Sequence, residues 1–371
     1  MALKTESMVL NMGPQHPSTH GVLRLELELE GELVLNVKPH LGYLHRCFEK
    51  HAEAMQYNQV VPYTDRLDYL ASIGNNFGYA LAVEKLMGIQ VPERVEYIRV
   101  IMAELQRIAS HQVALGSNGA DIGALPPFLY LFRDREHILS IIEETCGARM
   151  LYNYIWVGGL SHDIHPDFVR KTKEFVNHFK PTIVELDKLL SYNKIFIERT
   201  ANVGVLPLDT AINFGASGPT LRGSGIKFDL RRDDPYSIYD RFDFDIPVGK
   251  GLQGTVGDCW DRYYVRVREM EQSLRIIEQA IDQIPEGNVQ SAIPKRIKPP
   301  KGTVYTRIEN PRGELGYFII SDGNTNPFRV KVRAPSFVNL EVLGELCKGY
   351  LVADIIAILG SIDIVLGEVD R

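Results

Sequence analysis

Cysteine is scarce in this chain of 371 residues. The four cysteines lie far apart: Cys47, Cys146, Cys259 and Cys347. No two fall at the short spacing typical of zinc or iron–sulfur ligands, and they do not resemble the disulfide framework of a small secreted protein. We therefore expect the chain to hold no metal by itself and to work in a reducing, cytoplasm-like compartment. The N-terminus also lacks the pattern of a signal or transit peptide.

Long uninterrupted apolar runs and an excess of basic residues are also missing. The most apolar stretch, residues 350–367, contains Asp354 and Asp363, and carboxylates are costly at bilayer depth. It predicts a buried core helix followed by a turn. A formal net charge of −6 argues against a nucleic-acid-binding protein. With 45% hydrophobic and 24% charged residues, the chain has the composition of a folded protein, long enough for a large core and a smaller domain.

Near the N-terminus, apolar and charged residues alternate from residue 21 to 37, which predicts an antiparallel hairpin with one solvated face and a turn near Gly31. The inward face is expected to carry the leucines and the outward face the charges. The inward set is Leu23, Leu25, Leu27, Leu29, Leu33, Leu35 and Val37, and the outward set is Arg24, Glu26, Glu28 and Glu30.

The middle of the chain has helical periodicity, and the C-terminal part returns to strands. The predicted helices are about 67–83, 92–108, 127–146, 167–190 and 258–284, followed by strands at 304–309, 313–323 and 328–333 and a last helical region at 338–359. Two strand-rich ends around a helical bundle predict an α+β fold. The chain has no internal repeat.

Two imidazoles lie four residues apart in the segment GPQHPSTHGVLR, residues 13–24. Pro17 favours extended backbone at His16, so a helical zinc pair with His20 is not expected. The segment predicts a loop that carries titratable rings. Its histidines either belong to a site or cap the hairpin through hydrogen bonds.

Tyr69 and Asp121 each have a structural and a functional interpretation as well. Helical periodicity places Tyr69 at the edge of a core-facing stripe, where it packs, although its hydroxyl could donate to a ligand carbonyl. Asp121 lies at a predicted helix end as a capping carboxylate; beside a histidine it would instead raise the pKa of the ring.

Residues 249–254, GKGLQG, match the dinucleotide fingerprint G-x-G-x-x-G. A strand-like segment precedes the match, but a long charged helix follows, without a second parallel strand at the required distance. We therefore interpret these residues as an ordinary loop.

Several motifs occur in the order found in one protein family. They are GPQHPSTHGVLR, GYLHRCFEK, RLDYL, ADIGALPPF, LRGSGIKFDLRRDDPY, RGELGYF and KVRAPSF. Along essentially its whole length the chain resembles the 49-kilodalton subunit of respiratory complex I, NADH:quinone oxidoreductase. That resemblance implies the fold of nickel-iron hydrogenase large subunits. The two Cys-x-x-Cys pairs of hydrogenases are absent, and in the complex I family the metal-free cavity becomes the quinone headgroup site.

The resemblance also assigns roles to matching residues. His20 and Tyr69 correspond to the pair that hydrogen-bonds the quinone carbonyls, and Asp121 to the carboxylate partner of that histidine. His16 belongs to the same loop and shapes it. Arg46 corresponds to the arginine beside the terminal [4Fe-4S] cluster, which the adjacent small subunit holds; no cofactor is expected in this chain alone.

The implied protein is the quinone-site subunit of a proton-translocating enzyme, with menaquinone or ubiquinone as substrate. Its implied partners are the cluster-bearing small subunit, the 30-kilodalton-type subunit and the quinone-channel membrane subunit, at the cytoplasmic face of the bacterial membrane. The expected divisions are 1–60 (hairpin and quinone-site loop), 61–290 (helical core) and 291–371 (β-rich segment and final helix). A ferredoxin- or other-donor quinone reductase and a non-catalytic scaffold are the alternatives.

The chain departs from the family pattern at four positions. Leu151 replaces a histidine that touches the cluster in many relatives, which should lower the cluster potential and favours menaquinone. Trp156 replaces an arginine, Cys47 a glycine, and Ile364 a proline.

Overall fold

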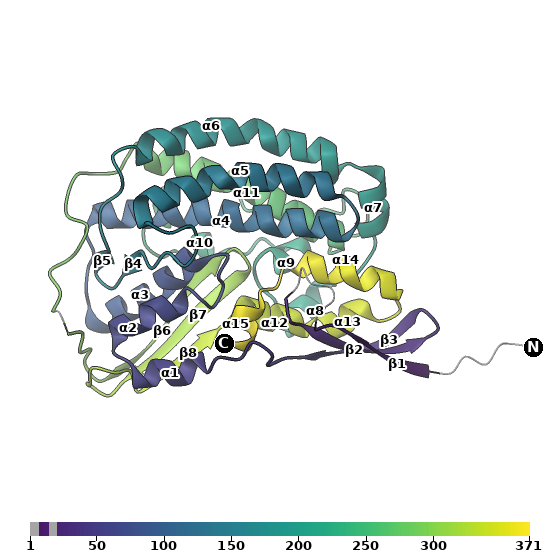
Figure 1. Cartoon of the computed structure of the whole chain (residues 1–371), viewed down its shortest axis with the longest axis horizontal. Helices are drawn as coiled ribbons and strands as arrows, with labels where there is room; N and C mark the ends of the chain where they lie inside the picture. Colours follow the sequence, from purple (N-terminus) through teal and green to yellow (C-terminus); the bar gives the residue numbers. More distant parts are fainter. Residues whose placement is uncertain (1–6, 15–20, 295) are drawn as a thin grey trace, which may run out of the picture.

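The computed structural model describes residues 7–14, 21–294 and 296–371. His16 and His20 lie outside the described residues. Figure 1 shows a layer of long helices along one side of the molecule and two sheets with shorter helices along the other.

The N-terminal sheet consists of three antiparallel strands. They are β1 (Ser7–Met12), β2 (Arg24–Glu30) and β3 (Leu33–His40), in the order β1-β2-β3. The hairpin prediction is confirmed for β2, whose leucines are buried while its charged side chains face outward. It is wrong for Leu33 and Leu35, which are 39% and 41% exposed. A register shift between Glu28 and Leu29 turns Val34 inward instead, because one extra residue reverses the alternation.

The helical layer contains four long helices: α4 (Glu93–Asp121), α5 (Leu125–Cys146), α6 (Phe168–Leu186) and α11 (Cys259–Ile281). All four were predicted, although α4 continues 13 residues beyond its predicted end at Ile108. This part of α4 is buried on most sides, so its apolar and polar residues no longer follow one stripe. Two short strands, β4 (Ile155–Trp156) and β5 (Gly159–Leu160), pair with each other, and β4 contacts α3 (Ser72–Met87). Helix α7 (Lys194–Thr200) follows α6 after a π-helical turn at Asp187–Ser191.

The second sheet is also antiparallel. Its strands are β6 (Gly302–Asn310), β7 (Gly313–Ser321) and β8 (Arg329–Arg333), and their prediction is confirmed. Helix α3 (Ser72–Met87) packs on it, with the rings of Tyr79 and Tyr317 5.7 Å apart. Two unpredicted helices, α1 (Phe48–Ala54) and α2 (Tyr57–Thr64), precede α3.

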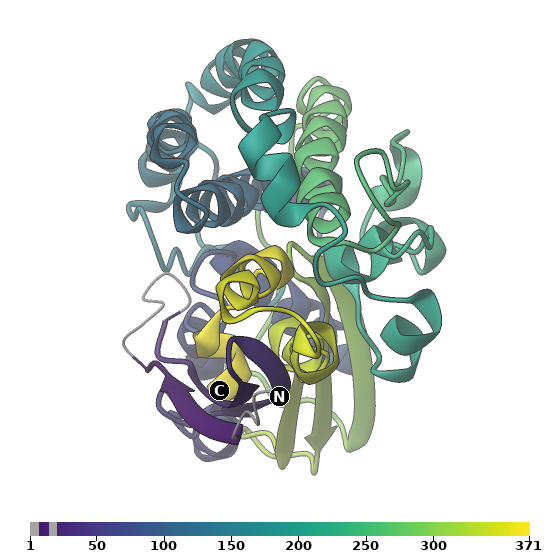
Figure 2. The same ribbon diagram turned by 90° about the vertical axis from the view of Figure 1, so that its right-hand side faces the viewer.

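The C-terminal region forms four short helices rather than the single helical region expected at 338–359. They are α12 (Pro335–Glu341), α13 (Leu343–Cys347), α14 (Val352–Ile362) and α15 (Leu366–Asp370). A left-handed Gly349 separates α13 from α14, and a left-handed Asp363 ends α14. The prediction of a buried helix and turn at 350–367 is confirmed. Figure 2 shows these helices, in yellow, between the helical layer and the N-terminal strands.

The G-x-G-x-x-G segment is a packed loop before α11, as expected. A Cβ atom on Gly249 would lie 1.8 Å from the carbonyl oxygen of Gly223, which explains this glycine without a nucleotide. Three short helices precede the loop: α8 (Leu208–Asn213), α9 (Gly218–Gly223) and α10 (Leu230–Asp233), with a 3₁₀ turn at Tyr239–Arg241.

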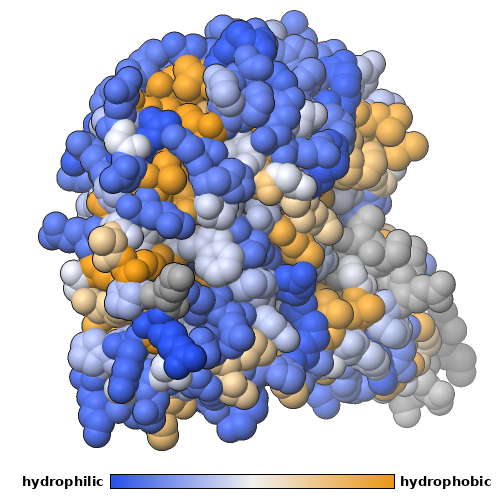
Figure 3. Space-filling view, turned by 60° about the vertical axis from the view of Figure 1, so that its left-hand side comes forward, coloured by the Kyte–Doolittle hydropathy of each residue, from blue (hydrophilic) through white to orange (hydrophobic). Residues whose placement is uncertain are grey.

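Every strand pairing in the described part of the chain is antiparallel, so the fold is α+β, as predicted. Among the described residues, no helix has both the length and the apolar character needed to cross a membrane. On the face drawn in Figure 3, apolar patches are interrupted by polar side chains.

Candidate functional site

Tyr69 lies in a tight loop between α2 and α3, not on a helix as its periodicity suggested. The side chain of Asp68 accepts a hydrogen bond from the amide of Leu70 (3.2 Å), and the carbonyl of Asp68 accepts one from the amide of Ala71. A side chain that satisfies nearby backbone groups competes with helix formation. The half-buried Tyr69 side chain is therefore held by a turn.

A small cavity of about 50 Å³ lies against Tyr69. Five parts of the chain contribute to its lining: Gly21, the Tyr69 loop (residues 65–71), helix α4, the turn between β6 and β7, and the C-terminal region. Its described lining residues are Gly21, Tyr69, Leu70, Val113, Ser117, Arg312, Gly360, Asp363, Ile364, Val365 and Leu366. The cavity thus lies between Tyr69 and Gly21, the residue that follows His20 in the sequence. A larger hollow of about 720 Å³ beside Tyr305 contains none of the predicted site residues.

Beneath the cavity lies a buried group of charged side chains that we call the Arg312 cluster. Its members are Asp68, Arg266, Arg312, Asp363 and Glu368. The guanidinium of Arg312 donates to the carboxylates of Asp68 (2.7 Å) and Asp363 (3.1 Å). Arg266 lies 3.8 Å from the other oxygen of Asp363. All of these side chains are less than 10% exposed. The residue before Tyr69 is thus anchored by a buried ion pair.

The Arg312 cluster contains three carboxyl groups but only two guanidinium groups. Its charges therefore balance only when one carboxyl group is protonated. Burial, together with the nearby charge of Asp68, raises the pKa of Glu368 to about 8. Glu368 is accordingly the member expected to carry a proton at neutral pH. Burial also raises the pKa of Tyr69, so its hydroxyl keeps its proton and remains a hydrogen-bond donor.

Arg46 is connected to the Tyr69 loop through α15. Its guanidinium donates to the carbonyl of Arg66 (2.8 Å), just before the turn, and to that of Gly367 in α15 (2.6 Å). The carboxylate of Asp370 in turn accepts from the amides of residues 42 and 44. Arg46 remains exposed overall; burial lowers its pKa, but an arginine keeps its charge at neutral pH.

Asp121 is the last residue of α4 and is half-buried. Its prediction as a helix-end residue is confirmed, but it ends the helix rather than capping its N-terminus. The described cavity lining includes Ser117, one turn earlier on α4, and not Asp121. Since His20 lies outside the described residues, their pairing stays a prediction.

The structure thus brings Tyr69 and Arg46 together at Gly367 of α15. The Arg312 cluster was missed by sequence reasoning. One signal could have revealed it. Asp363 and Glu368 interrupt an apolar segment that the structure buries, and a buried carboxylate requires a cation or a proton. Nothing in the sequence indicates that Arg312, some 50 residues earlier, supplies that cation.

Leu151 has a left-handed backbone, with φ of 60°, and Asn153 nearby has φ of 47°. Asparagine and histidine tolerate this region better than leucine does. The position is therefore better suited to a histidine than to the leucine present. Trp156, also predicted as a departure, donates from its indole to the carbonyl of Asn153 (2.9 Å), which explains its packing but not the replacement of an arginine.

Comparisons with known proteins agree with this picture. The family model described as the 49-kilodalton subunit of respiratory-chain NADH dehydrogenase matches residues 121–299 and 291–371. Proteins named as a subunit of NADH-quinone oxidoreductase are similar over the whole chain. The one from Chlorobaculum tepidum is 59% identical to this chain, and the one from Pelodictyon phaeoclathratiforme is 60% identical. The match covers 93% of the length of each of these two proteins. The corresponding protein of Cytophaga hutchinsonii is 57% identical, with 97% covered. The chain therefore belongs to the family of 49-kilodalton subunits of respiratory-chain NADH dehydrogenase, an oxidoreductase complex.

Proposed function

We propose that this chain is the quinone-site subunit of a proton-translocating NADH:quinone oxidoreductase. In this proposal Tyr69 and His20 hydrogen-bond the two quinone carbonyls and supply protons as the ring is reduced. Asp121 tunes the charge of His20, and His16 shapes the loop. The observation that supports the proposal best is the cavity shared by Tyr69, Gly21 and the buried charges of Arg312 and Asp363.

The surroundings of Tyr69 suit the proton-donating role. Burial keeps the phenol protonated until a better acceptor arrives, such as the oxygen of a reduced quinone. The nearby cation of Arg312 would stabilise the phenolate left after donation, because an opposite charge favours the ionised form. The cavity as described, about 50 Å³, is smaller than a quinone ring needs, so binding of the headgroup would require the cavity to widen.

Arg46 is proposed to face the terminal [4Fe-4S] cluster of the adjacent small subunit, from which electrons arrive. An exposed guanidinium, steadied by two backbone carbonyls, suits a position beside a negatively charged cluster. The cluster-bearing subunit, a 30-kilodalton-type subunit and the quinone-channel membrane subunit are the proposed partners. We also propose the hydrogenase-like superfamily fold, a peripheral position at the cytoplasmic face of the membrane, and the three divisions expected from the sequence.

The first test replaces Tyr69 by phenylalanine. Loss of a positioned proton donor typically lowers a rate by about 10²–10⁴-fold, so we expect at least a 100-fold fall in NADH-driven quinone reduction by membranes. Reduction of an artificial acceptor that takes electrons upstream should be unchanged, which controls for assembly. Tyr63→Phe, six residues earlier at an exposed position of α2, is the matched control and should retain quinone activity. Unchanged quinone activity in Tyr69→Phe would remove the proton-donor assignment.

The second test concerns the quinone type. If Leu151 faces the cluster, Leu151→His restores a hydrogen-bond donor and raises the cluster midpoint potential, measured by redox titration with electron paramagnetic resonance. We expect a rise on the order of 60 mV, a tenfold change for a one-electron couple. Leu151→Met, which adds no donor, should leave the potential unchanged. A wild-type potential already as high as in ubiquinone-using relatives would contradict the menaquinone assignment.

A ferredoxin- or other-donor quinone reductase is the second candidate, since the same cavity would serve it. Subunit composition of the purified complex separates the two. A flavin subunit that oxidises NADH supports the first candidate, and its absence supports the second. A non-catalytic scaffold predicts no effect of Tyr69→Phe.

A further inference from the structure

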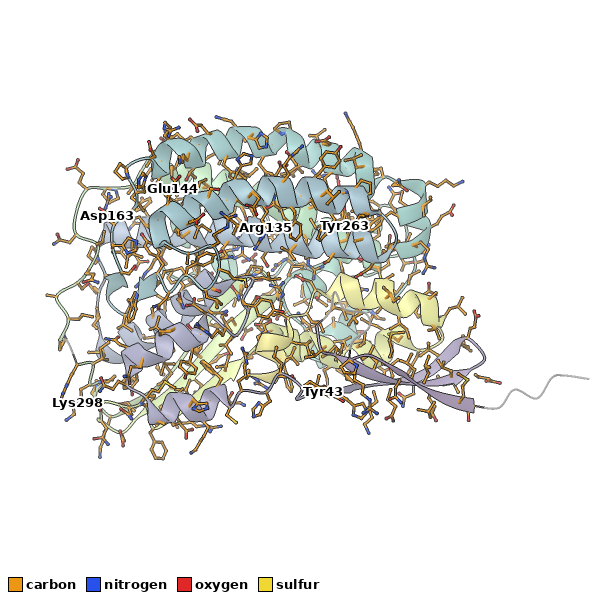
Figure 4. All side chains as sticks on the ribbon, in the orientation of Figure 1. Tyr43, Arg135, Glu144, Asp163, Tyr263 and Lys298 are labelled. Carbon is orange, nitrogen blue, oxygen red and sulfur yellow. The ribbon has the colours of Figure 1, made fainter. Side chains whose placement is uncertain are left out.

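A carboxylate and two imidazoles come together on the outer helical layer, far from Tyr69 in the sequence. Asp134 and His137 lie one turn apart on α5, and His178 lies on the neighbouring α6. One ligand atom from each of the three side chains lies within 4.8 Å of the other two. The imidazole rings are 4.8 Å apart, centre to centre. Figure 4 labels Arg135, the residue next to Asp134, on α5.

The central carboxylate is held in an ionised state. Burial alone would raise the pKa of Asp134, but hydrogen bonds from Arg133, His178 and Thr182 outweigh it and lower the pKa. The guanidinium of Arg133 donates to both carboxylate oxygens, at 2.8 and 3.1 Å. The carboxylate itself is fully buried, while Arg133, His137 and His178 reach solvent. A dissolved ion can therefore reach the imidazoles without opening the fold.

The spacing of two of the donor atoms fits a metal ion. The Nε2 atom of His178 lies 3.2 Å from Oδ1 of Asp134. In a tetrahedral zinc site with ligand bonds of about 2.0–2.1 Å, neighbouring ligand atoms are about 3.3 Å apart. A zinc ion would replace the proton shared by this pair, since metal ligands must be deprotonated. A ring nitrogen of His137 lies within 4.8 Å of these two atoms and would move closer to them to supply a third ligand.

We propose that Asp134, His137 and His178 bind one divalent transition-metal ion, with Zn²⁺ as the best match, and that this ion joins α5 to α6. Two imidazoles and one carboxylate form the ligand set of many zinc sites, and water completes the tetrahedron. Arg133 keeps its hydrogen bond to Oδ2 and orients the carboxylate, as outer partners of metal ligands commonly do. This site is separate from the proposed quinone site and does not depend on it. It revises the expectation, based on scattered cysteines, that the chain alone binds no metal.

The test measures zinc binding to the purified full chain by equilibrium dialysis against Zn²⁺ after removal of metals with EDTA. We expect one tight site in the wild type, weakened at least tenfold in His178→Ala and in His137→Ala, since loss of even an outer partner costs about 10–100-fold. Both imidazoles reach solvent, so these variants should fold. His51→Ala, which removes an exposed imidazole on α1, is the matched control and should keep the site.

A second readout reports the geometry directly. Co²⁺ bound to the wild type should give the intense visible absorption of tetrahedral coordination, and this absorption should be lost in His178→Ala and kept in His51→Ala. Equal zinc affinity in the wild type, in His178→Ala and in His137→Ala would overturn the proposal. So would a cobalt spectrum that His178→Ala leaves unchanged.

Discussion

Arg312→Met is expected to lower the free energy of unfolding by about 3–5 kcal/mol, the cost of leaving the other side of a buried ion pair without its partner. Arg312 is fully buried and bonds the carboxylates of Asp68, next to Tyr69, and of Asp363, which lines the cavity. Methionine fills similar space but supplies no charge. Urea denaturation of the full chain measures the loss.

Two comparisons make this result specific. Arg307→Met removes a partly exposed arginine that pairs with Asp234 at 2.8 Å, and it should cost at most about 1 kcal/mol because solvent screens that pair. The deficit of Arg312→Met should also shrink as the pH falls, because protonation neutralises the unpaired carboxylates. A loss below about 1 kcal/mol at neutral pH would mean that the Arg312 cluster contributes little to stability.

Gly367→Ala is expected to displace the Tyr69 loop and to reduce quinone reduction at least tenfold. A Cβ atom at Gly367 would lie 2.4 Å from the carbonyl oxygen of Leu67, 3.0 Å from that of Arg66, and 3.2 Å from the ring of Tyr69. Backbone oxygens cannot move aside as a flexible side chain can, so the loop and α15 must separate. Overpacking of this kind typically costs about 1–3 kcal/mol.

The matched control is Gly302→Ala, at the start of β6, where the new Cβ atom would lie 3.5 Å from a side-chain carbon of Leu86, an ordinary contact. Both variants are compared in urea denaturation and in NADH-driven quinone reduction, with the upstream acceptor as the assembly control. If Gly367→Ala behaved like Gly302→Ala in both measurements, the close packing of α15 on the Tyr69 loop would not position the site.

Local pattern predicted the long elements of this fold well. Each of β2, α5 and α6 has a periodicity that matches one buried face, so counting positions was enough to find them. The errors arose where burial did not follow that rule. The bulge that exposes Leu33 and Leu35 depends on how β3 meets its neighbour. The end of α4 is surrounded by other elements, so it shows no single stripe.

The sequence by itself determined the family of this protein, the α+β class and which residues match the quinone-site motifs, because these depend on the order and spacing of nearby residues. Only the tertiary structure decided that Tyr69 lies in a turn and that Arg312 joins Asp68 to Asp363. Only the tertiary structure also showed that His178 on α6 contacts Asp134 on α5. These contacts join residues between 44 and 244 positions apart. The pattern of residues around a side chain does not indicate its distant partner, because the two meet only when the folded elements pack together.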